Sequence, residues 1–491
     1  MGGTRGSEAA GDHSRDGPPF ASSAACRRLS VFQSTTLLAL FGTGGALIVL
    51  EPGAAASLMV AGAAAVFLAL SLWRIGLVVL SAAPLDDTIL TGRDVPAYTV
   101  LVALHDEAEI MDQLVARLAR IDYPADRLQG LLVLEAHDAA TIAAAERAAR
   151  PDWLQVFVAP PGGPATKPRA LNCALRCATG DLVTVYDAED EPHPLQLREA
   201  AARFAEDATG RLACLQAPLR IRPGAEGASP LIARQFAAEY AGLFETVLPG
   251  LARMGLPFPL GGTSNHFRAA ALRQVGGWDA FNVTEDADLG FRLWAEGWRL
   301  GVLGRPTWET PPGRLEEWLP QRTRWLKGYM QTFGVHSRRP WRLGGRGAFA
   351  LLATVGLAIA SAALHGPTVA WMIAQVLVAA TAGLTPGTPL LALGVLLLGA
   401  GSAWLSCAMG ARRAGVPYTL ADMASAPAYW ALQSLAAAHA AWRLVREPFA
   451  WDKTPHRRDA PAAAGPAHAA LYETAPDRLS AGHAAAPQPV A

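Results

Sequence analysis

The chain has 491 residues, enough for more than one domain. Its 42 basic and 42 acidic residues cancel, so no net charge attracts it to nucleic acid, and we expect no nucleic-acid partner. Hydrophobic residues make up 51% of the chain, a high share for a soluble enzyme, and they are concentrated at its two ends. We therefore expect a soluble middle domain between two membrane-associated regions.

The N-terminal region predicts a disordered tail followed by two transmembrane helices. Residues 1–30 are polar and rich in small residues, which is typical of a disordered cytoplasmic tail. Residues 31–83 contain two apolar runs that are separated by Glu51-Pro52-Gly53. Each run reaches the roughly 20 residues that a helix needs to cross a bilayer.

Basic residues on both sides of this pair predict its orientation. Arg27 and Arg28 precede the first run, and Arg74 lies near the end of the second. Because arginine is enriched on the cytoplasmic side of a membrane, both ends of the hairpin are expected there. The domain that follows, at residues 95–335, is then cytoplasmic.

The middle domain alternates between strand and helix patterns. We predict strands at 98–104, 131–134, 153–159 and 182–186, and helices at 110–120, 139–149 and 169–178. This alternation indicates βαβ units and a parallel sheet, in which ligands bind at the carboxyl ends of the strands. Asp106, Glu135 and Asp187 each lie at or just past such an end, so we expect one shared site.

The C-terminal apolar region, residues 347–442, predicts three to four transmembrane helices. Four spans are expected at 348–364, 367–384, 388–408 and 423–441, with turns at His365-Gly366-Pro367 and Thr385-Pro386-Gly387. Four spans return the chain to the cytoplasm but leave Arg412 and Arg413 outside, against the usual preference. Three spans with one interfacial helix are the alternative. Residues 443–491 are expected to form a cytoplasmic segment and a disordered tail.

The first segment that carries chemistry is Asp187-Ala188-Glu189-Asp190, directly after a buried strand. Carboxylates this close repel one another unless a cation joins them, and Mg²⁺ or Mn²⁺ prefers such oxygens together with substrate phosphates. The plainer interpretation is a solvated loop in which Asp190 caps a helix. We favour a metal site because the segment lies at a strand end.

Two further segments are consistent with a phosphate-bearing ligand. Lys167 opens a helix after a Pro/Gly loop, and a lysine at a helix N-terminus is a natural anion site. The run Gly261–His266 has two glycines that allow the backbone to approach a ligand closely. Taken alone, the first is equally well a capped helix start and the second an ordinary turn.

The segment Thr284-Glu285-Asp286-Ala287-Asp288 leads into a helix predicted at 289–296. A carboxylate at a helix start is often only a cap. Three of them near a metal site indicate that one is a general base, which a hydroxyl nucleophile needs during its attack.

A helix rich in arginine and aromatic residues is predicted at 318–332, within an interfacial segment at 316–333. Gln321, Arg324 and Trp325 lie about one turn apart and share a face. A tryptophan can stack on a sugar ring, and an arginine can bind a diphosphate. The alternative is an amphipathic helix on the membrane surface.

In this order, the segments resemble processive family-2 glycosyltransferases of the cellulose synthase type, over residues 95–335. The resemblance implies an α/β domain of the GT-A (nucleotide-diphospho-sugar transferase) fold inserted between α-helical transmembrane segments. It implies donor binding by Asp106, Glu135 or Asp138, and Asp187, next to the anion site at Lys167, and a metal held by Asp187 with Glu189 or Asp190. It also implies that Asp286 is the catalytic base, with Glu285 beside it, and that Gln321, Arg324 and Trp325 bind the acceptor and the diphosphate.

Some positions depart from the family pattern. Glu189 replaces an aspartate, which keeps Asp190 open as the second metal ligand. Phe449–Thr454 resembles the gating segment of cellulose synthases only loosely, and no PilZ domain is expected after it. These departures indicate a relative within the wider group.

The resulting hypothesis is a multi-pass enzyme of a bacterial inner membrane with a cytoplasmic catalytic domain. It would use Mg²⁺ or Mn²⁺, invert the anomeric centre, and move a sugar from a UDP-sugar to a growing β-linked polysaccharide. Export through the bilayer would follow, with possible export partner subunits. One alternative is transfer of a single sugar to a lipid carrier, so the expected acceptor is either a glycan or a lipid-linked molecule. Another is a non-catalytic nucleotide-sensing homologue.

Overall fold

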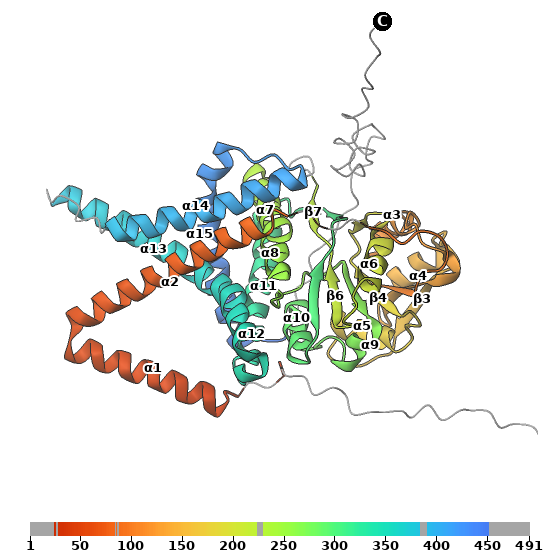
Figure 1. The fold of residues 1–491 in the computed structure, drawn as a ribbon, viewed down its shortest axis with the longest axis horizontal. Coiled ribbons are helices and arrows are strands. Elements are labelled where there is room, and N and C mark those ends of the chain that lie inside the picture. Colours follow the sequence, from red (N-terminus) through yellow and green to blue (C-terminus); the bar gives the residue numbers. More distant parts are fainter. Residues whose placement is uncertain are drawn as a thin grey trace, which may run out of the picture.

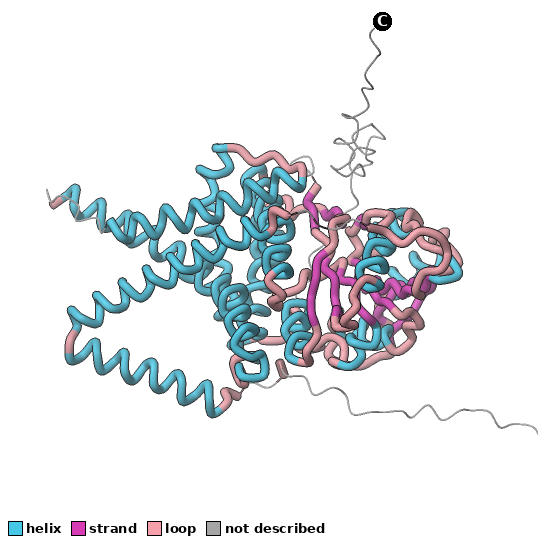
Figure 2. The backbone as a smooth tube through the Cα atoms, viewed as in Figure 1, coloured by secondary structure: helices cyan, strands magenta, loops and turns pink. Residues whose placement is uncertain are grey.

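The computed structural model describes residues 24–25, 28–83, 85, 88–222, 229–382 and 390–450. Most of the expected disordered ends, Arg27, the turn at Thr385–Gly387 and most of Phe449–Thr454 lie outside these residues. An α/β domain packs against a layer of long helices, from which α1, α2, α13 and α14 extend away on one side (Figure 1). Strands are confined to the α/β domain (Figure 2).

A seven-stranded sheet in the order β3-β2-β1-β4-β8-β6-β9 forms the centre of the domain. Its strands are β1 (Tyr98–Leu104), β2 (Leu128–Glu135), β3 (Leu154–Ala159), β4 (Leu182–Tyr186), β6 (Leu212–Gln216), β8 (Asn265–Arg268) and β9 (Arg299–Val302). The first four strands are parallel, as predicted. The strands at 98–104 and 182–186 have the predicted bounds.

The sheet is mixed, which corrects the expectation of a parallel sheet. Strand β8 runs antiparallel to both β4 and β6, and its first residue, Asn265, pairs with Val185 near the end of β4. The chain therefore enters β8 from the carboxyl edge of the parallel strands. This entry brings Gly261 and Gly262 to the edge where the ligand site is expected.

Helices cover both faces of this sheet. They are α3 (Met111–Leu118), α4 (Ala139–Arg147), α5 (Lys167–Leu175), α6 (Gln196–Ala205), α7 (Pro230–Gly242), α8 (Leu248–Arg253), α9 (Ala269–Gln274), α10 (Glu285–Ala295) and α11 (Leu315–His336). A π-helical turn, η3 (Leu243–Val247), joins α7 to α8. A small sheet of β5 (Glu191–Pro192), β10 (Thr307–Glu309) and β7 (Leu219–Ile221) lies beside the main one. The predicted helix at 289–296 begins four residues earlier, at Glu285.

The N-terminal apolar runs form α1 (Val31–Leu50) and α2 (Pro52–Leu80), with the predicted break at Glu51. Among the described residues, two helical stretches are long and apolar enough to cross a membrane, namely Val31–Leu50 and Pro340–Thr381. In α2, the comparably apolar part is Ala64–Leu80, which is shorter than either of these two stretches.

The predicted turn at His365-Gly366-Pro367 does not form. Helices α12 (Gly344–Leu351), η5 (Leu352–Gly356) and α13 (Leu357–Thr381) run on continuously, with Pro367 inside α13. The hydroxyl oxygen of Ser434 accepts a hydrogen bond from the Gly366 N–H at 2.8 Å, and Gly366 packs closely against that side chain. A neighbouring helix thus supports the backbone beside the proline, which is how apolar helices tolerate this residue.

The predicted spans at 348–364 and 367–384 thus fall in one continuous helix, and two further long helices follow among the described residues. Helix α14 (Leu390–Ala414) ends beside the catalytic domain, where Arg413 donates hydrogen bonds to Ser81 Oγ at 2.9 Å and to the Glu245 carbonyl at 2.6 Å. This contact puts Arg413 on the domain side of α14, whereas the four-span interpretation expects it on the far side; the number of spans stays a prediction. Helix α15 (Leu420–Arg446) contacts the domain at both ends, through Asp422 with Arg234 and through the Glu447 carbonyl with Lys327. Helix α15 therefore contacts the domain along its length from Asp422 to Glu447.

Candidate active site

A cavity of about 380 Å³ opens at the carboxyl edge of β1, β2 and β4. Helices α5, α7, α10 and α11 and the loop before β8 complete its walls. Nine of the residues predicted for the site line it: Glu135, Lys167, Asp187, Glu189, Glu285, Asp286, Gln321, Arg324 and Trp325. Segments far apart in the sequence thus converge on one space, while Asp106, Asp138 and Asp190 lie outside its lining.

The turn after β1 places Asp106 differently from the prediction. Asp106 adopts a positive φ of 56°, and its backbone N–H donates a hydrogen bond to the Asp138 carboxylate. The residues on either side of it, His105 and Glu107, line the cavity instead. Glu107 was missed by sequence reasoning, although a second acidic residue next to Asp106 was a visible signal.

Asp138 has a structural position at the start of α4. Its carboxylate accepts hydrogen bonds from the N–H groups of Asp106 and Thr141. Burial opposes its negative charge, but these hydrogen bonds outweigh burial and lower the pKa of Asp138. Of the two alternatives at this strand end, Glu135 is the one that faces the cavity, where it pairs with Arg169 at 3.7 Å.

Lys167, at the start of α5, joins Asp187 of the segment Asp187–Asp190 to the loop at Gly261 and Gly262, called the glycine loop below. Its ammonium donates hydrogen bonds to Asp187 and to the Gly262 carbonyl, the latter at 2.9 Å. Burial lowers the pKa of Lys167, but the carboxylates of Asp187 and Glu285 outweigh burial and raise it. Lys167 is therefore a charged ammonium on the cavity wall, suited to a phosphate.

The two candidates for the second metal ligand, Glu189 and Asp190, point in different directions. Glu189 lines the cavity, whereas Asp190 is fully buried and accepts hydrogen bonds from the Asp187 N–H at 2.7 Å and from the Thr263 hydroxyl. Burial and the nearby Asp187 and Glu189 raise the pKa of Asp190. In this arrangement Asp190 fixes the loop, and Glu189 is the carboxylate that can reach a ligand.

Glu309, at the end of β10, is a further acidic residue of the cavity that the sequence did not reveal. It is buried, and burial together with Asp190 and Glu189 raises its pKa well above the ordinary value. No pattern in the sequence distinguishes Glu309, because it comes from a strand of the small sheet that sequence periodicity did not predict.

The acidic wall fits a divalent cation shared with a substrate. No three of the described His, Cys, Asp and Glu side chains are already arranged around one point. Mg²⁺ and Mn²⁺ need only one or two protein carboxylates when phosphate oxygens supply further ligands. Asp187 and Glu189 both face the cavity, and burial, followed by the neighbouring carboxylates Asp190 and Glu189, raises the pKa of the nearby Glu309. The donor set therefore suits such an ion.

The start of α10 presents two carboxylates to the same space. Glu285 is buried, and burial followed by the neighbouring Asp286 raises its pKa to about 7. Burial also raises the pKa of Asp286, whose carboxylate accepts a hydrogen bond from the Ala287 N–H at 2.7 Å. A Cβ on Gly262 would lie 3.3 Å from Asp286 Oδ2, so the glycine loop passes directly beside this carboxylate.

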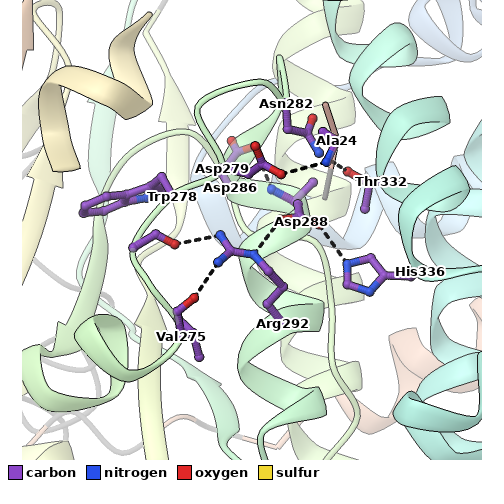
Figure 3. Close-up of polar contacts among 12 residues, drawn as sticks. Ala24, Val275, Trp278, Asp279, Asn282, Asp286, Asp288, Arg292, Thr332 and His336 are labelled. Carbon is purple, nitrogen blue, oxygen red and sulfur yellow. Dashed lines mark hydrogen bonds and ion pairs between the residues drawn. The ribbon is translucent and has the colours of Figure 1, made fainter. Parts of the chain in front are cut away.

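The third carboxylate of this segment, Asp288, has structural partners. It is fully buried between Arg292 Nε at 2.7 Å and His336 Nε2 at 2.9 Å (Figure 3). Arg292 in turn donates to the carbonyls of Val275 and Gly277. Burial opposes the charge of Asp288, but Arg292 and His336 outweigh burial and lower its pKa to about 2. Asp288 therefore holds α10 in place and does not face the cavity.

Helix α11 brings Gln321, Arg324 and Trp325 to the cavity. The Gln321 side-chain oxygen is buried and has no hydrogen-bond partner among the described residues, so a ligand donor can pair with it. Arg324 reaches the Val283 carbonyl at 3.5 Å, next to the segment with Glu285 and Asp286. The expected shared face is thus present, and it lies against the domain.

Two family descriptions match this sequence. Residues 99–224 match "Glycosyl transferase family 2", and residues 182–409 match "Glycosyl transferase family group 2". This chain carries family-2 glycosyltransferase domains. The match extends beyond the cavity into the helices that follow it.

Curated relatives of several kinds share the central part of the chain. The probable glycosyltransferase YdaM of Bacillus subtilis is 24% identical over 239 residues, which is 48% of this chain and 56% of that protein. A β-monoglucosyldiacylglycerol synthase of Synechocystis is 28% identical over 246 residues, 48% of this chain and 49% of that protein. Cellulose synthase 1 catalytic subunit of Komagataeibacter xylinus is 24% identical over 242 residues, 49% and 32% respectively. The matched region thus spans about half the length of the first two relatives.

A solved structure shares the fold. A mannosyltransferase from Pyrobaculum calidifontis, determined with GDP-Man and Mn²⁺, superposes with a TM-score of 0.53 at 22% identity. The superposition covers 78% of this chain and 98% of that one. The domain therefore has a GT-A-like nucleotide-sugar transferase fold with a mixed sheet. The matches include polysaccharide synthases and a glycolipid synthase, so they do not select the processive type.

Proposed function

We propose that this protein is an inverting glycosyltransferase that uses a UDP-sugar and a divalent cation at a membrane. One observation carries the proposal. The loop at Gly262 touches Lys167 through its carbonyl and passes beside the Asp286 carboxylate, while Lys167 pairs with Asp187. The ammonium of Lys167, which suits the phosphates, and the carboxylate of Asp286, which suits a base for the acceptor, therefore both lie next to Gly262.

The reaction follows from this placement. The Asp286 carboxylate takes the proton of the acceptor hydroxyl as its oxygen attacks the anomeric carbon. The bond from that carbon to the diphosphate oxygen breaks on the opposite face, so the configuration inverts. Lys167 and Arg324 face the developing charge on the leaving diphosphate. A bound Mg²⁺ or Mn²⁺, held by Asp187 and Glu189, would add further stabilisation of that charge.

The other side chains of the cavity hold and orient the substrates. Glu107 and Glu135, at the ends of β1 and β2, border the end of the cavity farthest along the parallel sheet and are placed for the nucleoside. Trp325 and the unpartnered oxygen of Gln321 border the acceptor. The membrane in this proposal is supported by two helical stretches that are long and apolar enough to cross a bilayer. A cytoplasmic position for the domain, at a bacterial inner membrane, is supported by the arginines that flank the N-terminal apolar runs.

Nucleotide release tests the proposal. Membranes containing the full chain are incubated with a panel of UDP-sugars and with Mn²⁺, Mg²⁺ or EDTA, and released UDP is measured. We expect release that depends on the metal, is lost with EDTA, and falls at least a hundredfold in Asp286→Asn, whose UDP binding persists. Turnover that survives in Asp286→Asn would remove Asp286 as the base. A chain that binds UDP-sugars but releases no UDP would be a sensor.

A further inference from the structure

The cavity has two ends of opposite chemical character. Next to the acidic and basic groups of the donor end, one wall consists of Leu219, Tyr240, Leu243, Phe244 and Leu260. The aliphatic and phenyl side chains among these have no atom that can donate or accept a hydrogen bond. A sugar acceptor carries hydroxyls around its ring, and burial against such a wall leaves them without partners.

This apolar wall lies directly beside the proposed base. A Cβ on Gly261 would meet the Phe244 ring at 3.1 Å, and one on the adjacent Gly262 would meet Asp286 Oδ2 at 3.3 Å. Phe244 and Asp286 thus contact two consecutive residues of the same loop, Gly261 and Gly262. A hydroxyl placed at Asp286 for deprotonation has its carbon skeleton against the apolar wall.

The same wall connects the cavity to the long apolar helices. Leu243 and Phe244 belong to η3, whose Thr246 hydroxyl lies 2.7 Å from Ser406 Oγ of α14. Where α7 meets η3, Gly410 of α14 approaches the Ala241 carbonyl so closely that no Cβ would fit. The segment that carries Leu243 and Phe244 on the cavity wall therefore packs directly against α14.

The charge of the cavity narrows the class of acceptor further. Glu285, Asp286 and Glu309 border it in addition to the proposed metal ligands, so its acidic side chains outnumber Lys167 and Arg324, and the burial that raises the pKa of these three carboxyl groups disfavours any added negative charge. A phosphorylated lipid carrier would bring a second anion beside them, and its phosphate oxygen is already ionised and needs no base. A neutral alcohol needs the base and meets no repulsion.

From these observations, and on the basis of the proposed transferase activity, we propose that the acceptor is the hydroxyl of a neutral glycerolipid of the diacylglycerol class. Asp286 removes the proton of the free glycerol hydroxyl, that oxygen forms the bond to the anomeric carbon, and the diphosphate leaves. The product is a neutral lipid with one sugar. The apolar wall binds the first part of the acyl chains.

An acceptor competition in bilayers tests this proposal. The full chain is reconstituted in phosphatidylcholine vesicles with Mn²⁺ and a radiolabelled UDP-sugar that supports UDP release. Dioleoylglycerol, a polyprenyl phosphate and a soluble β-linked oligosaccharide are supplied separately. We expect label in a neutral lipid product with dioleoylglycerol, at a rate at least about tenfold above the other two. Equal or faster labelling of the oligosaccharide or of the phosphorylated lipid overturns the glycerolipid acceptor while leaving the transferase in place.

Absence of UDP release with every donor and every acceptor overturns the transferase itself, and this inference with it.

Two further measurements test whether the apolar wall binds the acyl chains. For the unaltered chain, KM for short diacylglycerols below their micellar concentration should fall at least about tenfold from dibutyryl- to dioctanoylglycerol, because methylene groups become buried. A KM that does not change with chain length contradicts the proposal.

A matched pair of variants at Leu243 gives the second measurement. Leu243→Met keeps the volume and the apolar surface, whereas Leu243→Gln has a similar shape and a polar end. We expect Leu243→Gln to raise KM for the diacylglycerol about tenfold and Leu243→Met about twofold or less, with KM for the donor changed little in both. Equal KM values for the diacylglycerol in the two variants contradict the apolar contact.

Discussion

The guanidinium carbon of Arg322 lies 4.6 Å from the centre of the Trp325 ring, on the same helix, α11. The same guanidinium group donates to both carboxylate oxygens of Glu239 on α7, and to the Tyr429 hydroxyl of α15 at 3.1 Å. Arg322 thus joins three helices behind the tryptophan that borders the acceptor. It lies inside the segment Gln321–Trp325, yet sequence reasoning assigned functions only to its neighbours.

We predict that Arg322 positions Trp325. Arg322→Lys keeps the charge but loses the planar fork and most of the ring contact. The acceptor KM should rise about threefold to tenfold with little change in the donor KM, and stability should fall by about 1–2 kcal/mol, since Glu239 is partly exposed. Glu239→Gln, which leaves the arginine over the ring, should have the smaller effect on the acceptor KM. An equal effect would assign the positioning to the ion pair instead.

A second prediction concerns the crossing of α11 over the start of α10. A Cβ on Gly328 would lie 2.2 Å from Thr284 Oγ1, next to Glu285 and Asp286, so only glycine fits there. Gly328→Ala should displace this segment and lower kcat at least about tenfold. Gly334→Ala on the same helix is the control, since its Cβ meets nothing within 4 Å. It should keep kcat and gain up to about 1 kcal/mol of stability. Equal kcat values for Gly328→Ala and Gly334→Ala would show that close packing of α11 on Thr284 is not needed for catalysis.

Much of the site was predictable because its residues follow buried strands in the sequence. Asp187 and Glu135 lie at strand ends that parallel pairing brings to one edge, and the period of apolar residues reveals those strands. Glu309 and the apolar wall were not predictable. They come from short strands and from a π-helical turn whose position depends on tertiary contacts with the long helices. The direction of β8 was likewise invisible, since periodicity carries no information on strand direction.

The segment at the start of α10 shows the limit of motif reasoning in another way. Its three carboxylates, Glu285, Asp286 and Asp288, are chemically alike in sequence, and only the fold separates them. Asp288 faces Arg292 and His336 because it lies on the opposite side of the first helical turn from the cavity. The sequence could therefore place the site without assigning each carboxylate.

This separation gives a third prediction, on the variants Asp286→Asn and Asp288→Asn. The first should lose activity without losing stability, because burial already opposes the charge of Asp286. The second should lose about 3 kcal/mol of stability at pH 7, because the partly buried Arg292 is left without its partner charge. Since the pKa of Asp288 is lowered from 3.8 to about 2, its stabilising contribution is complete above pH 3.8 and is lost as the pH falls through 2. Thermal unfolding and UDP release distinguish the two, and a stable Asp288→Asn would contradict the structural role.

The last prediction concerns Glu285, whose pKa is raised from 4.5 to about 7 by burial and by Asp286. Because the unfolded chain ionises this carboxyl first, its favourable contribution is complete below pH 4.5 and is lost as the pH rises through 7. Glu285→Gln keeps the shape of the neutral acid and removes that loss. In metal-free detergent solution we expect the two proteins to unfold at similar temperatures at pH 4.5.

At pH 8.5 the Glu285→Gln variant should be more stable, by up to about 3 kcal/mol for a shift of this size. Its transferase activity should nevertheless fall, since Glu285 faces Lys167 across the cavity and contributes to the field that keeps this lysine charged. Unfolding curves measured from pH 4.5 to 8.5 test the difference. A constant offset between the two proteins across that range would show that Glu285 does not titrate there, and that its carboxylate is already ionised when the enzyme binds its donor.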